Sequence, residues 1–354
     1  MNNVVRRSLY LLFGLFSLLG SLMVWLVLPD QPGSSKTLHF EGFIPLPAVN
    51  NSSSISVLDF LTVSGGNLYA TGISSGATYK IALQQHRALG TSEKFNITVF
   101  EGSPSVHEVI IDPATDLGFV TRSGEDTVDV FDTRTMQKTK QIAVAPDPDV
   151  ILFDPEHRLI YAASAEGMAA TLIDLEALSV AATIPLGGQG EYAVLDPKTK
   201  LIYQNLSDVG ELVTVNPEQG TVVARYPLGD CAMPTGMAID ADDRRLFIAC
   251  AKSSNLLVVD LEREPSIIKS YPISFGTDAV AYDSQSRKIY TTGLLGRMTV
   301  IEQESANNYR VIETVPLHFN AHTLTVDPAT HQLFVGYTGF WSQPKIAVFT
   351  PMPG

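Results

Sequence analysis

Cysteine is nearly absent from this chain, which has 2 in 354 residues, Cys231 and Cys250. Two thiols are too few for a disulfide-dense scaffold or for a zinc site built from four thiolates. Basic residues are also scarce, with 24 Lys and Arg against 37 Asp and Glu and a formal net charge of −13. Because binding to phosphate backbones depends on a basic surface, we expect no nucleic acid as main partner. The sequence also lacks a P-loop, a dinucleotide-binding glycine motif and a haem-attachment motif.

One long apolar run is present, from Leu9 to Leu28, and Arg6 and Arg7 precede it. A helix of about 20 residues spans about 30 Å, the thickness of a membrane's hydrocarbon core. Because flanking arginines stay in the cytoplasm, residues after 30 are expected outside it. We predict a signal anchor and linker over residues 1–36, with a cleaved signal peptide or a twin-arginine export signal as alternatives. The predicted location is extracytoplasmic, in the periplasm or at the cell surface.

A phrase of about 43 residues recurs in the rest of the chain. It consists of an apolar strand, an Asp that is often followed by Pro, a few mostly polar residues and an aromatic. The aspartates are Asp112, Asp154, Asp196, Asp240, Asp283 and Asp327. Seven residues after each comes Phe119, Tyr161, Tyr203, Phe247, Tyr290 or Phe334, and Tyr69 fits one unit earlier, with Thr62 in place of the Asp. Seven aromatics in register indicate seven structural units.

Each unit is predicted to form four short strands, without helical periodicity. Four antiparallel strands in 40–50 residues are typical of a β-propeller blade, so we predict an all-β, seven-bladed β-propeller over residues 37–354, preceded by one N-terminal transmembrane helix. The last unit supplies Leu333–Tyr337 and Lys345–Phe349 but is one strand short. We expect the orphan strand Leu38–Ile44 to complete this blade and close the ring.

The phrases from Asp112-Pro113 to Phe119-Val120-Thr121 and from Asp327-Pro328 to Phe334-Val335 resemble the repeats of YVTN-type seven-bladed propellers of exported bacterial proteins. The resemblance covers nearly all of residues 37–350. Relatives of this type include surface-layer proteins, ligand binders and the propeller subunits of quinoprotein amine dehydrogenases, and lactonase-type propellers are more distant. The resemblance implies the fold, and it leaves the function open among these classes.

The first strand of each blade lines the axial channel, so the residues that begin these strands should converge at one channel mouth. The position five residues before each turn Asp is occupied by His107, Asp149, Glu191, Thr235, Asp278 and His322, and by Val57 in the first blade. One position later are Glu108 and Tyr192. His157 and His331 are instead expected in exposed hairpin turns.

Three interpretations of this ring compete. It is a solvated rim of the channel, a divalent-metal site, or a site for a cationic or polyhydroxylated ligand. A metal such as Zn²⁺ or Mn²⁺ would take His107, His322 and one carboxylate as ligands, and it would support hydrolysis. We therefore predict an anchored propeller that binds a small-molecule ligand or another envelope protein at the mouth. The alternatives are a metal-dependent, lactonase-type hydrolase and an accessory subunit of a periplasmic dehydrogenase.

The two cysteines flank the first hairpin of the fifth blade. Thr235 should pair near Cys250, which places both sulfurs on one face if the chain at Cys231 folds back. An oxidising compartment permits a disulfide between them, and a copper-binding pair is the less favoured alternative.

Overall fold

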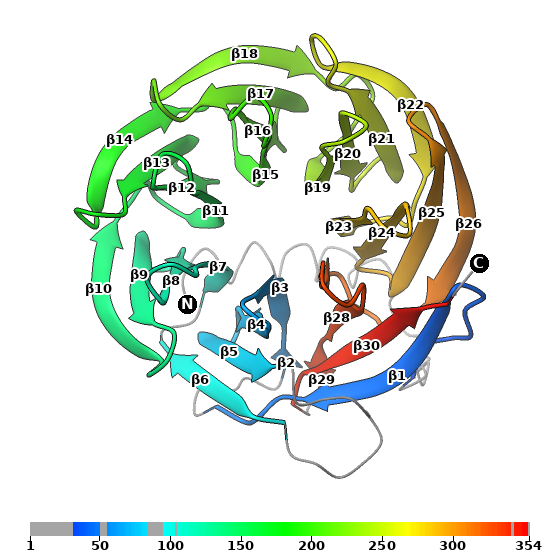
Figure 1. The fold of residues 1–354 in the computed structure, drawn as a ribbon, viewed down its shortest axis with the longest axis horizontal. Helices are drawn as coiled ribbons and strands as arrows, with labels where there is room; N and C mark the ends of the chain where they lie inside the picture. The colour runs from blue at the N-terminus through cyan, green and yellow to red at the C-terminus, as the bar shows by residue number, and fades with distance from the viewer. Residues whose placement is uncertain (1–30, 50–54, 84–94, 103–104, 341–342, 353–354) are drawn as a thin grey trace, which may run out of the picture.

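The computed structural model describes residues 31–49, 55–83, 95–102, 105–340 and 343–352, which form a ring of seven four-stranded antiparallel sheets (Figure 1). The described residues contain no helix, and thus none able to cross a membrane. The prediction of an all-β, seven-bladed propeller is confirmed. The predicted anchor helix at Leu9–Leu28 lies outside the described residues.

The blades follow one another along the chain, and in each the first strand is innermost. Blade 1 contains β3 (Leu58–Ser64), β4 (Asn67–Gly72), β5 (Ala77–Ala82) and β6 (Ile97–Glu101). Blade 2 contains β7 (Val106–Asp112), β8 (Leu117–Arg122), β9 (Thr127–Asp132) and β10 (Gln137–Ala143). Blade 3 contains β11 (Pro148–Asp154), β12 (Leu159–Ser164), β13 (Ala169–Asp174) and β14 (Ser179–Pro185).

The next three blades repeat this order. Blade 4 contains β15 (Gly190–Leu195), β16 (Ile202–Leu206), β17 (Glu211–Asn216) and β18 (Thr221–Pro227). Blade 5 contains β19 (Pro234–Asp240), β20 (Arg245–Cys250), β21 (Asn255–Asp260) and β22 (Ser266–Pro272). Blade 6 contains β23 (Thr277–Asp283), β24 (Lys288–Gly293), β25 (Arg297–Ser305) and β26 (Asn308–Pro316).

Blade 7 is built from both ends of the propeller sequence. Its strands are β27 (Leu324–Val326), β28 (Leu333–Tyr337), β30 (Lys345–Pro351) and, outermost, β1 (Leu38–Pro45). β1 pairs antiparallel with β30, as predicted for the orphan strand, and in Figure 1 this blue strand lies beside the red one. Two further short strands, β2 (Ile55–Ser56) and β29 (Gly339–Phe340), form a separate pair.

The repeated aromatics hold neighbouring blades together. All seven are buried, and none of these residues is more than 4% exposed to solvent. Each packs into the blade that follows it: Phe119 of blade 2 contacts the cluster around Ile151 and Ile160, and Phe334 of blade 7 contacts the cluster around Leu68. Because a buried aromatic removes roughly 150–250 Å² from water, these rings stabilise the blade junctions all the way around the propeller.

The repeated aspartates lie at the end of each first strand, at the face that we call the turn end. There each carboxylate accepts hydrogen bonds from its own hairpin turn, as Asp196 does from the Lys198 N–H and the Thr199 hydroxyl. Several also pair with the next blade: Arg244 lies 2.7 Å from Asp196, and His331 lies 2.8 Å from Asp283. The turn aspartates therefore fix both turn geometry and blade spacing. His331 and His157, expected in exposed turns, are half-buried there, and each is bonded to an Asp.

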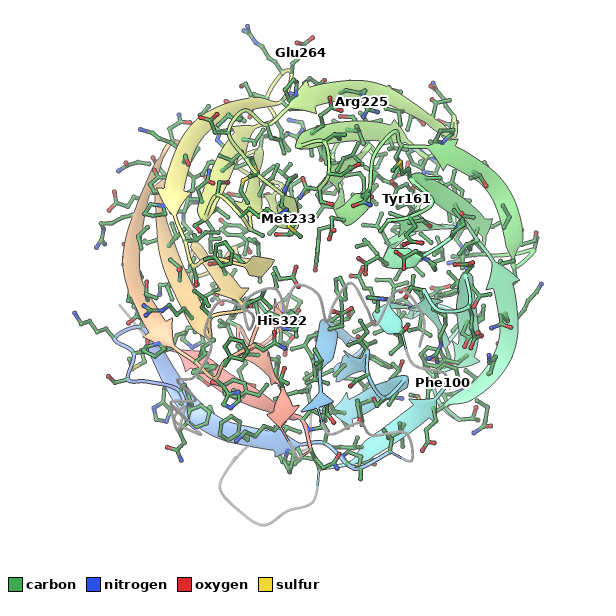
Figure 2. The ribbon with its side chains drawn as sticks, turned by 180° about the vertical axis from the view of Figure 1, so that it is seen from behind. Phe100, Tyr161, Arg225, Met233, Glu264 and His322 are labelled. Carbon is green, nitrogen blue, oxygen red and sulfur yellow. A yellow bond between two sulfur atoms is a disulfide. The ribbon has the colours of Figure 1, made fainter. Side chains whose placement is uncertain are left out.

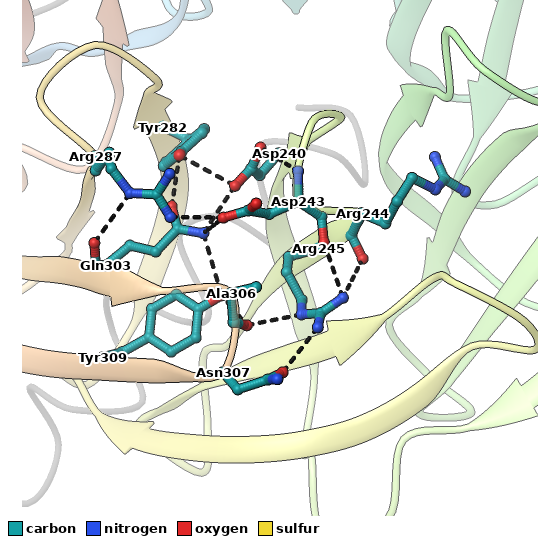
Figure 3. Close-up of polar contacts among 10 residues, drawn as sticks. All are labelled: Asp240, Asp243, Arg244, Arg245, Tyr282, Arg287, Gln303, Ala306, Asn307 and Tyr309. Carbon is teal, nitrogen blue, oxygen red and sulfur yellow. Dashed lines mark hydrogen bonds and ion pairs between the residues drawn. The ribbon is translucent and has the colours of Figure 1, made fainter.

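A network of polar contacts joins blades 5 and 6 at this face (Figure 3). Gln303 donates to Asp240 and Asp243, and Arg287 donates to Asp243. Arg245 binds the Ala306 carbonyl and the Asn307 side chain across the junction. All of these groups are satisfied by one another, which is the pattern of a structural network rather than of a binding site.

Candidate functional site at the channel mouth

The first strands begin at the opposite face, which we call the mouth. Six of the seven first strands carry a register shift at their beginning, for example between Val106 and Val109 in blade 2. A β-bulge of this kind redirects side chains. In blades 1 and 2 a threonine on the second strand accepts a hydrogen bond from the backbone N–H at the bulge: Phe60 N donates to Thr71 Oγ1 and Glu108 N to Thr121 Oγ1, both at 3.0 Å. The bulges thus turn residues at the strand beginnings toward the channel.

These side chains surround a cavity of about 220 Å³ at the mouth, which we call the well. The polar residues on its wall include Asp59, His107, Asp149, Glu191, Tyr192, Thr235 and Asp278. The sequence-predicted His322 and Glu108 are buried beside the well and do not line it. Figure 2 shows His322 and Met233 next to the central opening, whereas Arg225 and Glu264 lie on the outer rim.

Asp59 is the functional residue that the sequence interpretation missed. The first hairpin of blade 1 turns through Gly65 and Gly66, both at positive φ, and is two residues shorter than the turn after Asp112. Counting five residues back from Thr62 therefore gave Val57, which was wrong, whereas counting from the true strand end at Ser64 gives Asp59. The Gly-Gly pair is itself the sequence signal of a two-residue hairpin, and it could have corrected the count.

His107 connects two carboxylates in the well. Its Nδ1 lies 2.6 Å from Asp59 Oδ2 and 3.0 Å from Asp149 Oδ1, and its Nε2 lies 2.9 Å from Ser123 Oγ. Burial by itself would lower the pKa of His107, but the charges of Asp149 and Asp59 outweigh it and raise the pKa well above its usual value. His107 Nδ1 therefore faces two carboxylates at once, one from blade 1 and one from blade 3.

His322 occupies the other side of Asp59. Its Nε2 lies 3.9 Å from Asp59 Oδ1 and 3.9 Å from Asp278 Oδ2. Burial would lower the pKa of His322, yet the nearby carboxylates of Asp59 and Asp278 raise it to about 8. For Asp59, burial opposes ionisation, but His107 and then His322 hold the pKa of its carboxyl well below its usual range. Asp59 is thus the anionic link between the two histidines.

The remaining carboxyls of the mouth resist ionisation. Burial, followed by the charges of Asp149 and Asp278, raises the pKa of Glu191 well above its usual value. Burial raises the pKa of Asp278 to about 6, although 46% of its side chain faces the channel. Burial also raises the pKa of Glu108 to about 8, against a hydrogen bond that it accepts from Ile151 N. More carboxyl groups converge at the mouth than there are cations to balance them.

An aromatic pair crosses the channel one residue deeper than the ring. Phe60 of blade 1 and Tyr192 of blade 4 stack with ring centroids 5.7 Å apart, although their blades lie on opposite sides of the opening. Both line the well. The stack narrows the channel at this level and gives the well an apolar floor.

Cys231 and Cys250 form a disulfide that ties the loop before β19 to the end of β20. Met233, in the same loop, lines the well. The cross-link therefore restrains one segment of the mouth, in keeping with a wall of fixed shape.

Among the described residues, one group of three could hold a metal ion: Asp59, His107 and Asp149, whose donor atoms all lie within 4.8 Å of one another. The set differs from the predicted one, because His322 is not a member and Asp59 replaces it.

No protein-family model matches the chain, and no curated protein matches it. Several solved structures, in contrast, are similar to this chain. A chain of Kuenenia stuttgartiensis hydrazine synthase is similar with a TM-score of 0.70 and 14% identity, over 82% of this chain and 95% of that one. A chain of a mitotic checkpoint complex is similar with a TM-score of 0.70 and 11% identity, over 93% of this chain and 99% of that one. At such low identity the likeness establishes the propeller fold alone, and the resemblance to YVTN-type repeats stays a resemblance.

Proposed function

We propose that the protein is an extracytoplasmic, membrane-anchored propeller that binds a ligand or a partner protein through a cationic group placed in the well. The observation that carries the proposal is the convergence of Asp59, Asp149, Glu191 and Asp278 around one cavity of about 220 Å³. A cation entering the well would favour ionisation of carboxyls that burial otherwise keeps protonated. Tyr192 offers an aromatic face to the same group.

The face around the well supports recognition of something larger than a bare ion. Met168, Val209, Phe275 and Leu295 are exposed on loops at the mouth end of blades 3 to 6. These loops adjoin the beginnings of the first strands, as the hydrogen bond from Leu294 N to the Gly276 carbonyl shows for blade 6. Apolar side chains around an acidic cavity suit a ligand or partner whose cationic group is attached to an apolar body.

Binding of small organic cations tests the proposal. We expect spermidine, choline or arginine methyl ester to bind the purified full-length chain and raise its melting temperature, and acetate not to do so. Glu191→Gln and Asp278→Asn should weaken the binding at least about 10-fold, since each removes a charge that faces the ligand. Asp230→Asn is the matched control, because Asp230 is exposed in a loop of the same face but does not line the well. The proposal fails if no cation binds, or if all three variants bind like the wild type.

The location is part of the same proposal. It is supported by the apolar run Leu9–Leu28 behind two arginines and by the Cys231–Cys250 disulfide, since disulfides persist mainly in oxidising compartments. Protease treatment of intact cells and spheroplasts, with alkaline extraction of the membranes, tests it. A chain that is protected in spheroplasts, or extracted without detergent, would contradict it.

The lactonase-type hydrolase remains the second candidate because the mouth contains a group of possible metal ligands. Hydrolysis of simple lactones by the full-length chain in the presence of Mn²⁺ or Zn²⁺ tests it, and absence of turnover above the metal-only rate excludes it for those substrates. The accessory-subunit alternative stays a prediction.

A further inference from the structure

The group Asp59, His107 and Asp149 differs from the His–Asp pairs at the turn end, and its contacts of 2.6 and 3.0 Å are closer than the 3.9 Å that separates His322 from Asp59 and Asp278. The pairs His157–Asp154 and His331–Asp283, at the turn end, each contain one carboxylate, and that carboxylate also accepts hydrogen bonds from its own turn. At the mouth, two carboxylates from blades 1 and 3 face one imidazole nitrogen from blade 2. Within the described residues, neither Asp59 nor Asp149 accepts a hydrogen bond from its own hairpin turn, and His107 is the nearest charged partner of both.

We propose that Asp59, His107 and Asp149 bind one divalent metal ion, Mn²⁺ or Zn²⁺, through one carboxylate oxygen from each Asp and through Nδ1 of His107, which releases its proton to water when the metal binds. This inference rests on the proposed cation-binding role of the well and names the cation. One imidazole nitrogen with two carboxylate oxygens and no thiolate suits these borderline and hard ions better than soft ones.

The distances from His107 Nδ1 to the two carboxylates are already close to the distances between ligand atoms around a bound metal ion. His107 Nδ1 lies 2.6 and 3.0 Å from the two nearest carboxylate oxygens. Ligands at about 2.1 Å from a metal lie roughly 3.0–3.4 Å from one another in octahedral or tetrahedral sites. The two nitrogen–oxygen distances would need to lengthen by less than about 1 Å, and the donor atoms of the two carboxylates already lie within 4.8 Å of each other.

The surroundings orient the imidazole for this task. Ser123, itself buried, lies 2.9 Å from Nε2, so Nε2 is engaged on the side away from the well and Nδ1 is directed at the carboxylates. Metal-bound histidines almost always have such a partner on the second nitrogen. The three side chains are only 13%, 15% and 22% exposed, yet all three line the well. A metal held by three protein donors would keep a coordination position open to that cavity, where an oxygen of a ligand could bind.

Metal analysis of the full-length chain tests the inference directly. The protein is stripped with EDTA, dialysed against MnCl₂ or ZnCl₂ and measured by mass spectrometry and titration calorimetry. We expect one ion per chain. Asp59→Asn, Asp149→Asn and His107→Gln should each weaken binding more than about 100-fold, and Ser123→Ala by about 10- to 100-fold, as for other groups that support a metal ligand. Asp230→Asn is the matched control, since it removes a carboxylate from an exposed loop of the same face but none that lines the well, and it should leave the affinity unchanged within about two-fold.

A spectroscopic measurement keeps the test valid if a variant folds poorly. Bound Mn²⁺ should show nitrogen coupling in its pulsed electron paramagnetic resonance spectrum in the wild type and in Asp230→Asn, and this coupling should be lost in His107→Gln. The inference is overturned if neither ion binds at millimolar concentration, if the nitrogen coupling is absent from the wild type, or if Asp230→Asn is as damaging as the ligand variants. If organic cations bind and the metals do not, the proposed function stands and only the metal assignment fails. If neither binds, both fail.

Discussion

The two ends of the same inner strands carry similar residues but use them differently. At the turn end, Asp112, Asp196 and Asp283 are each bonded within their own turn and matched by Arg158, Arg244 or His331 from the next blade. At the mouth, five residues earlier along the strand, carboxyls meet other carboxyls across the channel, and two histidines are all that balances them. The difference shows that a repeated Asp within a hairpin is a structural element, whereas acidic residues that converge from different repeats without enough partners indicate a binding site.

Breaking a charge pair at the turn end should have the largest effect. Arg244 and Asp196 are 4% and 0% exposed, so Arg244→Ala leaves a buried carboxylate without its cation. We expect a loss of about 3–5 kcal/mol in the free energy of unfolding, measured by denaturant titration. Arg310→Ala, which removes an exposed partner of Glu302, is the control and should leave stability unchanged within error. Equal losses in the two variants would contradict the distinction.

The stability of the mouth should depend more on the Cys231–Cys250 disulfide than on the charges of its side chains. Cys231 and Cys250 are 19 residues apart in sequence, and closing a loop of that length stabilises a protein by about 3 kcal/mol. Replacing both cysteines by alanine should therefore lower the melting temperature, and a reducing agent should lower that of the wild type but not that of the variant. A wild type insensitive to the reductant would show that the mouth loop is held by other contacts.

The smallest effect should be a gain in stability that grows as the pH rises above about 4.5 and is complete above about 8. The folded state raises the pKa of Glu108 from its ordinary value of 4.5 to about 8, so its contribution to stability is complete below about pH 4.5 and is lost as pH rises through about 8. Glu108→Gln keeps an amide oxygen to accept from Ile151 N and cannot ionise.

Its melting temperature should exceed that of the wild type by a few degrees near pH 9 and equal it near pH 5. His322 has the same sign of pH dependence, which is why the variant is compared with the wild type at each pH. Parallel curves for the two proteins would contradict the assignment of the raised pKa.

The repeat made most of the fold predictable. Aromatics such as Phe119 and Tyr161 mark positions that every blade must bury against its neighbour, and Leu38–Ile44 had no other partner than the incomplete last blade. The ring of His107, Asp149 and Asp278 was predictable for the same reason, since equal positions in equal units meet at the axis. The position of Asp59 could not be predicted in this way, because the Gly65–Gly66 turn of blade 1 is two residues shorter than the turn after Asp112 and shifts the corresponding positions of that blade. The β-bulges that turn Glu108 away from the well and Asp149 into it could not be predicted either. The periodicity of a strand predicts that side chains alternate between its two faces, but it does not predict where a bulge interrupts this alternation.

The pairing of β1 with β30 also has a consequence for how the molecule is made. An early strand of the chain has its only described neighbour in a strand that is synthesised more than 300 residues later. Until then β1 has no sheet to join, and the seventh sheet lacks its edge. The circle therefore cannot close before Lys345–Pro351 has been synthesised, and loss of a few residues from this strand should prevent closure more effectively than a longer deletion in a surface loop.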